Sequence, residues 1–253
     1  MSIKKTTDLK DNLTQYLLDL RLSTVNRLYE ETARQATKNS ISYEQYLYDL
    51  MVSEYDGRWH KKIERLLKAS RLPLEKRWDN FKQSRIPLKV KQQTNQLLTG
   101  DFLTHSTNVL AFGVPGSGKS HLLCAIAQEL VKRGHRILFA TCSILVQELL
   151  ISKKRLELAK HLKRLSKYEA IIIDDIGYVQ QNRDEMEVLF TLLADCYEQR
   201  SIMLTSNLPF SKWEHIFKDP MTTAAAIDRL VHHSVIIELN ISSYRMETAK
   251  ENK

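Results

Sequence analysis

An eight-residue stretch near the middle of the chain has residue types and spacing that suit phosphate binding. It reads Gly113-Val114-Pro115-Gly116-Ser117-Gly118-Lys119-Ser120 and matches the pattern G-x-x-x-x-G-K-[ST]. Glycines let backbone N–H groups converge on phosphate oxygens without a Cβ in the way. In this pattern Lys119 reaches the β- and γ-phosphates of ATP, and the Ser120 hydroxyl holds Mg²⁺. We therefore expect an ATP and Mg²⁺ site here, with His121 as the last candidate nucleotide-binding residue.

Two later apolar runs each lead into polar side chains. Ile171-Ile172-Ile173 is followed by Asp174 and Asp175, and Ile202–Thr205 is followed by Asn207. Ligand groups gather where the strands of a parallel sheet end. We expect Asp174 to hold magnesium, Asp175 to activate the attacking water, and Asn207 to bond the γ-phosphate or that water. The alternative for Asn207 is a role in a turn only.

The C-terminal region contains two arginines that could contact phosphate. Arg229 could enter the ATP site of a neighbouring subunit and stabilise charge on the transferred phosphoryl group, which requires an oligomer. The alternative is a surface ion pair with Asp228. Arg245 is a second candidate. His232-His233 could suggest a metal, but adjacent helix positions do not face one another and no third ligand is suitably spaced, so we expect none.

Strands and helices must hold these groups in place. The glycine loop lies between an apolar run at 109–112 and an amphipathic helical pattern at 119–133. Further apolar runs lie at 137–140, 170–173, 202–205 and 235–239. They alternate with helical patterns, including a helix at 143–151 and a basic helix at 153–167. This alternation predicts an α/β fold, a P-loop NTPase with a central parallel sheet flanked by helices.

The N-terminal part of the chain has a different pattern. Only Gly57 and Gly100 of the seven glycines lie in the first hundred residues, and Ser42 and Gln45 have the spacing of a capping box before a helical run. We therefore expect a small helical domain over 1–75, a basic connector over 76–105 and the ATPase domain over 106–253.

Charge is concentrated in one segment of the chain. The net charge is +8, and residues 58–91 hold twelve Lys/Arg and three Asp/Glu, so the remainder is close to neutral at −1. Such a block is typical of a protein that binds nucleic acid, although a solvated helix face is the alternative.

Composition indicates where such a chain works. It lacks an 18-residue apolar run, so we expect no membrane span. Three widely spaced cysteines fit neither a zinc pattern nor a disulfide framework. Both observations predict a cytoplasmic protein.

In this order, the motifs resemble those of the IstB-like ATPases, AAA+ helper proteins of IS21-family bacterial insertion sequences and relatives of the DnaC helicase loader and the DnaA initiator. The resemblance covers most of 60–247, and its motifs are Gly113–Ser120, Ile171–Tyr178, Leu204–Phe210, Ile227–His233 and Ser243–Arg245. It implies an AAA+ fold of the initiator-loader group. It also implies that Asn207 is sensor I, Arg229 the arginine finger and Arg245 sensor II.

The resemblance further implies a homo-oligomer that assembles on duplex DNA at the bacterial nucleoid and delivers target DNA to a partner transposase. We expect little sequence preference and phosphate contacts from two basic sets: Arg58, Lys61, Lys62, Arg65, Lys68, Arg71, Lys76 and Arg77, and Lys153, Lys154, Arg155, Lys160, Lys163 and Arg164. Two features depart from the wider AAA+ pattern. Asp175 stands where many members have Glu, and only fourteen residues follow Leu239, too few for a full C-terminal lid.

Three other functions remain open from the sequence. A replicative helicase loader shares every ATPase motif but should favour single strands and a hexameric helicase. A small-molecule phosphotransferase would need a mobile lid and an acceptor pocket and would not explain the basic block. A DNA-bending scaffold would bind ATP without hydrolysing it.

Overall fold

The computed structural model describes residues 2–177, 182–217 and 219–244. Contacts within the chain divide it into two units, Met1–Arg65 and Leu66–Lys253. The first unit contains α1 (Ser2–Asp19), α2 (Ser23–Lys38) and most of α3 (Tyr43–Ser70). No helix among the described residues is long and apolar enough to cross a membrane.

The first unit is held together by a carboxylate at the start of α2. Glu54 of α3 is buried, and its Oε2 accepts hydrogen bonds from the backbone N–H groups of Thr24 (2.7 Å) and Val25 (3.1 Å). Its other oxygen, Oε1, accepts one from Arg58 Nε at 2.8 Å. The first N–H groups of a helix have no partner within the helix, so Glu54 satisfies two of them with a negative charge where the helix dipole favours one.

The second unit is built on a five-stranded sheet in which every recorded strand pair is parallel. The strand order is β2-β3-β4-β1-β5. The strands are β1 (Asn108–Gly113), β2 (Ile137–Thr141), β3 (Ala170–Asp174), β4 (Ser201–Ser206) and β5 (Ser234–Leu239). The predicted α/β class is confirmed, and each strand covers its expected apolar run.

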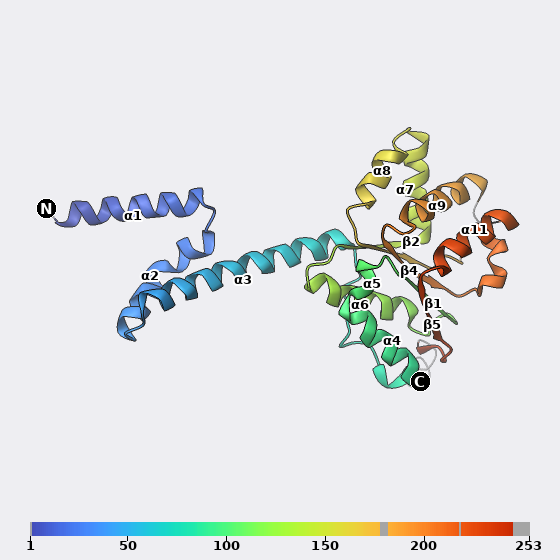
Figure 1. The fold of residues 1–253 in the computed structure, drawn as a ribbon, viewed down its shortest axis with the longest axis horizontal. Coiled ribbons are helices and arrows are strands. Elements are labelled where there is room, and N and C mark those ends of the chain that lie inside the picture. Colours follow the sequence, from blue (N-terminus) through green and yellow to red (C-terminus); the bar gives the residue numbers. More distant parts are fainter. Residues whose placement is uncertain (1, 178–181, 218, 245–253) are drawn as a thin grey trace, which may run out of the picture. The chain divides into compact units, whose positions relative to one another are not determined.

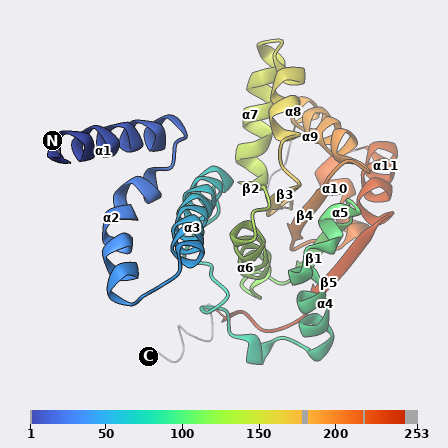
Figure 2. The same cartoon turned by 60° about the vertical axis from the view of Figure 1, so that its left-hand side comes forward.

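Helices cover both faces of this sheet (Figures 1 and 2). Because side chains alternate along a strand, Ile171 and Ile173 pack with α7, α9 and α11, whereas Ala170 and Ile172 pack with α4 and α6. The helices of this unit are α4 (Leu88–Thr99), α5 (Asp101–Thr104), α6 (Lys119–Lys132), α7 (Cys142–Lys154), α8 (Leu158–Leu165), α9 (Arg183–Cys196), α10 (Glu214–Phe217) and α11 (Pro220–Val231). Two 3₁₀ turns, η1 (Gln83–Arg85) and η2 (Phe210–Lys212), complete the set.

The basic helix expected at 153–167 is shorter in the structure. α7 continues to Lys154, and Leu156 then adopts a left-handed conformation with φ of 57°. The α8 helix begins only at Leu158. Lys153 and Lys154 therefore end one helix, while Lys160, Lys163 and Arg164 lie on another.

Residues 76–105, expected as a connector, form part of the core of the second unit. Val90 and Leu97 of α4 and Phe102 of α5 are buried against the sheet face that α6 also covers. At the start of this stretch, Gln128 Nε2 of α6 donates hydrogen bonds to the carbonyls of Pro73 (3.0 Å) and Lys76 (3.1 Å). These bonds hold the following residues, 77–86, beside the phosphate loop.

Candidate nucleotide-binding site

The phosphate loop connects β1 to α6, and its glycines are structurally required. Gly118 precedes α6 with φ of 97°, a conformation that residues with a Cβ rarely adopt. Gly116 has φ of 81°, and a Cβ there would collide with Ser243. The positive end of the α6 dipole points at this loop, which makes it an anion-binding site.

The side chain of Lys119 is buried against the phosphate loop. Its side chain is 5% exposed, and its Nζ donates hydrogen bonds to the carbonyls of Gly113 (2.8 Å) and Val114 (3.0 Å). A buried ammonium group needs such partners. The contacts hold its charge at the phosphate loop, beside the cavity that Lys119 lines.

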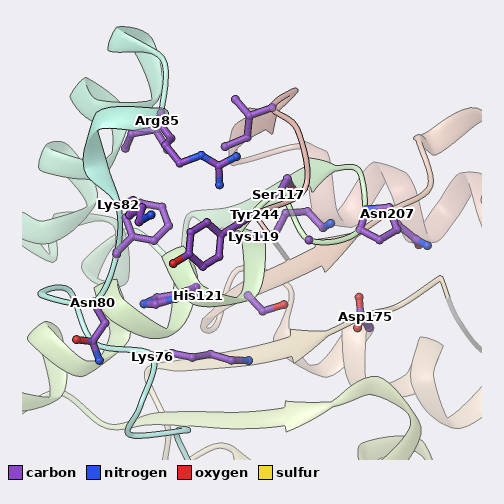
Figure 3. Close-up of a pocket in the computed structure, with 17 residues that line it drawn as sticks. Lys76, Asn80, Lys82, Arg85, Ser117, Lys119, His121, Asp175, Asn207 and Tyr244 are labelled. Carbon is purple, nitrogen blue, oxygen red and sulfur yellow. The ribbon is translucent and has the colours of Figure 1, made fainter. Parts of the chain in front are cut away.

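A cavity of about 390 Å³ adjoins the loop (Figure 3). Asp175 and Asn207 lie towards one end, whereas Asn80, Lys82 and Arg85 lie towards the other. The remaining lining residues are Lys76, Phe81, Ile86, Pro115, Gly116, Ser117, Gly118, Lys119, Ser120, His121, Ile241 and Tyr244. The structure thus brings the predicted loop, Asp175 and Asn207 to one cavity.

The two acidic residues are connected through Thr205. Its buried hydroxyl donates a hydrogen bond to Asp174 Oδ1 at 2.7 Å and accepts one from the backbone N–H of Asp175 at 2.8 Å. Asp175 itself is left-handed, with φ of 61°. Thr205 is a candidate site residue that was not predicted from the sequence; the available signal was a hydroxyl within an apolar strand that ends at the site.

Two buried polar atoms at the cavity have no hydrogen-bond partner within the described part of the chain. They are Asn207 Oδ1 and Ser117 Oγ. Buried polar atoms in proteins are almost always bonded, so such exceptions need an explanation. A bound nucleotide and its attacking water would supply O–H donors and phosphate acceptors, so these atoms fit the ATP and Mg²⁺ that the sequence predicts.

The C-terminal segment crosses the phosphate loop. The backbone N–H of Tyr244 donates to the Gly116 carbonyl at 3.0 Å, and Arg85 donates to the Ser242 carbonyl at 3.0 Å. The Tyr244 ring lies 4.8 Å from the Lys82 ammonium and 5.3 Å from the Arg85 guanidinium. Arg245, the sensor II candidate, lies outside the described residues.

Arg229 is not among the residues that line the cavity. Its guanidinium stacks over the Phe190 ring at 4.8 Å and donates to the Ala225 carbonyl at 3.0 Å. Within a single chain it therefore belongs to a separate surface of α11.

The candidate DNA-binding residues are distributed over both units. Arg58, Lys61, Lys62 and Arg65 belong to the first unit and the others to the second. Some of them make other contacts within the chain. Lys76 lines the cavity, and Arg71 and Lys153 form salt bridges of 2.8 Å with the carboxylates of Glu148 and Glu187. Lys154, Arg155, Lys163 and Arg164 are exposed.

One expectation about the histidine pair needs correction. The ring centroids of His232 and His233 are only 4.1 Å apart, because these residues lie where α11 ends rather than inside a helix. Glu198, distant in sequence, brings a third ligand atom within 4.8 Å of theirs. The sequence offered no such third ligand.

Cys124, Cys142 and Cys196 are buried, and none of them forms a disulfide within the described part of the chain. Burial raises the pKa of Cys124 to about 12 and that of Cys196 to about 12. Both thiols are therefore protonated at neutral pH, and neither is suited to metal binding or nucleophilic chemistry.

Residues 15–252 match the family model of the IstB-like ATP binding protein. The chain belongs to the IstB-like ATP-binding proteins. This IstB-like chain is 40% identical over 94% of its length to an insertion sequence ATP-binding protein of Sinorhizobium fredii, covering 80% of that protein. It is 34% identical over 92% of its length to the IS21 ATP-binding protein of Pseudomonas aeruginosa, covering 88% of it.

Solved structures support the AAA+ fold of this IstB-like chain. AMPPCP-bound DnaA from Aquifex aeolicus matches 72% of the chain with a TM-score of 0.55 and 16% identity, over 55% of DnaA. DnaI matches 63% of the chain with a TM-score of 0.50 and 22% identity, over 88% of DnaI. At these identities the likeness concerns the fold alone.

Proposed function

We propose that this IstB-like chain is a Mg²⁺-dependent ATPase that assembles on duplex DNA and supports the transposase of its insertion sequence. The observation that carries the proposal is the cavity in which the phosphate loop faces Asp175 and Asn207. A phosphate loop alone binds nucleotide, whereas hydrolysis also needs groups that position water.

Within the cavity, each end has a separate task. The loop N–H groups and Lys119 would bind the phosphates, and the rings of Phe81 and Tyr244, which line the same cavity, would contact the base. Ser120 and Asp174 would hold Mg²⁺, which when bound neutralises charge on the phosphates. At the end of the cavity where Asp175 and Asn207 lie, Asp175 would accept a proton from the attacking water, and Asn207 Oδ1 would orient that water.

The position of Arg229 supports an active site that is shared between subunits. Because it lies outside its own cavity, its charge can reach a transferred phosphoryl group only from a neighbouring subunit. Binding of ATP between subunits then favours assembly, and hydrolysis loosens it.

The DNA part of the proposal rests on charge. Residues 58–91 have a balance of +9 from twelve basic and three acidic residues, and α8 adds exposed Lys163 and Arg164. Binding through phosphates releases counterions, so affinity should fall steeply with salt. The choice of a transposase as partner is supported by the relatives, whose names place them in insertion sequences. Work on chromosomal DNA would place the protein at the nucleoid.

A replicative helicase loader is the second candidate function. The structural likeness to DnaI is compatible with it, but that likeness concerns the fold alone. The insertion-sequence relatives favour the first proposal because their sequence identity is higher and spans nearly the whole chain.

The decisive experiment measures binding of labelled duplex and single-stranded DNA with ATP, with ADP and without nucleotide, while particle size is recorded. Tight duplex binding in large assemblies only with ATP supports the proposal. Preference for single strands, or no DNA binding without a helicase, contradicts it and favours the loader. Loss of turnover in Asp175→Asn with assembly retained excludes a scaffold that never hydrolyses ATP.

A further inference from the structure

A cluster of two histidines and a glutamate lies at the opposite end of the sheet from the nucleotide cavity. His232 and His233 precede β5, and Glu198 lies between α9 and β4. The His233 carbonyl accepts a hydrogen bond from the N–H of Asn108, the first residue of β1, at 2.7 Å. The phosphate loop follows the other end of β1, so this cluster is separate from the ATP-linked Mg²⁺ site.

We infer that Glu198, His232 and His233 form a binding site for a divalent transition-metal ion, with Zn²⁺ as the expected occupant. Each residue offers one ligand atom, and these atoms lie within 4.8 Å of one another. All three side chains are exposed, so small rotations can bring the atoms to one ion. Two imidazoles and one carboxylate, with a fourth position for water, form a zinc-type ligand set, whereas Mg²⁺ and Ca²⁺ prefer oxygen ligands.

The backbone on both sides of this cluster is fixed before any ion binds. Glu198 is held in a left-handed turn with φ of 56°, and the next two N–H groups, of Gln199 and Arg200, both donate to the Cys196 carbonyl at 3.0 Å. Arg200 is buried and pairs with Asp195 at 3.0 Å, which anchors that turn. Because the backbone is held, only the three side chains lose conformational freedom on binding, and this favours affinity.

Tyr197 positions one of the ligands. Its hydroxyl lies 2.9 Å from His232 Nδ1. If Nδ1 carries the proton and donates to this hydroxyl, Nε2 remains as the ligand atom. A hydrogen bond on the second ring nitrogen is the usual arrangement for metal-binding histidines, and its loss typically lowers metal affinity about 10- to 100-fold.

An ion here would act on the helix that carries Arg229. His232 lies three residues after Arg229, and its N–H donates to the Asp228 carbonyl at 2.9 Å. The metal would join this end of α11 to the turn before β4. The ion would therefore restrain the C-terminal end of α11, which carries Arg229 and which the proposed function needs to be rigid. The metal site itself does not depend on that function.

The test uses the untagged full chain, treated with a chelator and kept free of nucleotide. Titration calorimetry with ZnCl₂ should give one ion per chain, and CoCl₂ should produce the visible absorption of a four-coordinate site. Glu198→Gln, His232→Ala and His233→Ala should each abolish stoichiometric binding. Tyr197→Phe should keep the stoichiometry and weaken affinity about 10- to 100-fold.

Two variants serve as controls. His105→Ala removes another exposed histidine and should bind zinc as the wild type does. Asp174→Asn alters the ATP site and should also retain zinc. The inference is overturned if the wild type takes up less than one ion, if Glu198→Gln binds normally, or if Asp174→Asn loses the ion. Circular dichroism of each variant verifies that a loss of binding is not a loss of fold.

Discussion

The hydroxyl of Thr205 donates a hydrogen bond to Asp174 Oδ1 at 2.7 Å. Because Thr205 Oγ1 also accepts a hydrogen bond from the backbone N–H of Asp175, one side chain of β4 contacts both acids at the end of β3. The hydroxyl thereby restrains the Asp174 carboxylate, which we propose as a Mg²⁺ ligand, and the backbone of Asp175, whose residue lines the cavity. Thr205 is therefore a positioning residue for the proposed hydrolysis.

Thr205→Val removes this hydroxyl without changing the shape of the side chain. We expect kcat for ATP hydrolysis to fall about 10- to 100-fold, as for other residues that orient metal ligands, while the Kd for ATP changes little. Steady-state turnover and nucleotide titration measure the two quantities. Thr205→Ser keeps the hydroxyl and should retain most activity. Wild-type turnover in Thr205→Val would contradict the role.

Gly177 leaves room for Asn207. A Cβ at position 177 would lie 2.5 Å from Asn207 Oδ1 and 3.1 Å from the Leu208 side chain. We expect Gly177→Ala to displace Asn207 and to lower kcat as much as Asn207→Ala does, with ATP binding retained. The double variant should be no worse than either single one, because both changes remove the same interaction. Additive losses would show that Gly177 acts elsewhere.

Arg229→Ala tests the shared active site. We expect ATP binding to persist while hydrolysis falls about 10³-fold, since an arginine finger stabilises charge only in the transition state. The loss should be seen at protein concentrations where the wild type is assembled. Mixing Arg229→Ala with Lys119→Ala, which should not bind nucleotide, should restore turnover because each chain supplies what the other lacks. Normal hydrolysis by assembled Arg229→Ala would exclude the role.

Glu54→Gln should destabilise the first unit by about 1–3 kcal/mol at pH 7, because a neutral amide at position 54 would leave the start of α2 without its charged acceptor. Burial acts to raise the pKa of Glu54, but hydrogen bonds from Arg58, Val25 and Thr24 outweigh it and lower the pKa below 4.5. A lowered pKa gives stability that is complete above the unfolded-state value and disappears as pH falls through the folded-state value.

The difference in stability between wild type and Glu54→Gln should therefore shrink below about pH 4.5. Urea unfolding and hydrogen exchange of the α2 amides measure it. Glu31→Gln, which alters an exposed pair with Arg34, serves as the control and should change stability little. A difference that stays constant from pH 7 to pH 3 would mean that the charge of Glu54 is irrelevant.

The basic surface of α8 gives a prediction about salt. Replacing Lys163 and Arg164 by alanine should weaken duplex binding and reduce the slope of log affinity against log salt by about 1.8, since each phosphate contact contributes about 0.9. Lys153→Ala is the comparison, because Lys153 is paired with Glu187 at 2.8 Å and should change the slope less. Fluorescence anisotropy at several salt concentrations measures the slope. An unchanged slope in the double variant would place the DNA path elsewhere.

The sequence by itself determined the local parts of this protein. The glycine loop, the strands and the two acids at the end of β3 follow from backbone freedom, side-chain alternation and charge, which act between near neighbours. That Asp175 and Asn207 meet at one cavity could be predicted because strands of a parallel sheet end at the same edge.

The tertiary structure decided what depends on contacts between distant segments. Residues 77–86 and 241–244 meet at the cavity through bonds such as that of Arg85 to the Ser242 carbonyl, 157 residues apart. The hydrogen bond from Thr205 to Asp174 and the approach of Glu198 to His232 and His233 also depend on contacts between distant segments. No local pattern encodes these contacts, because they depend on the order in which the strands pack and on where each loop leaves the sheet.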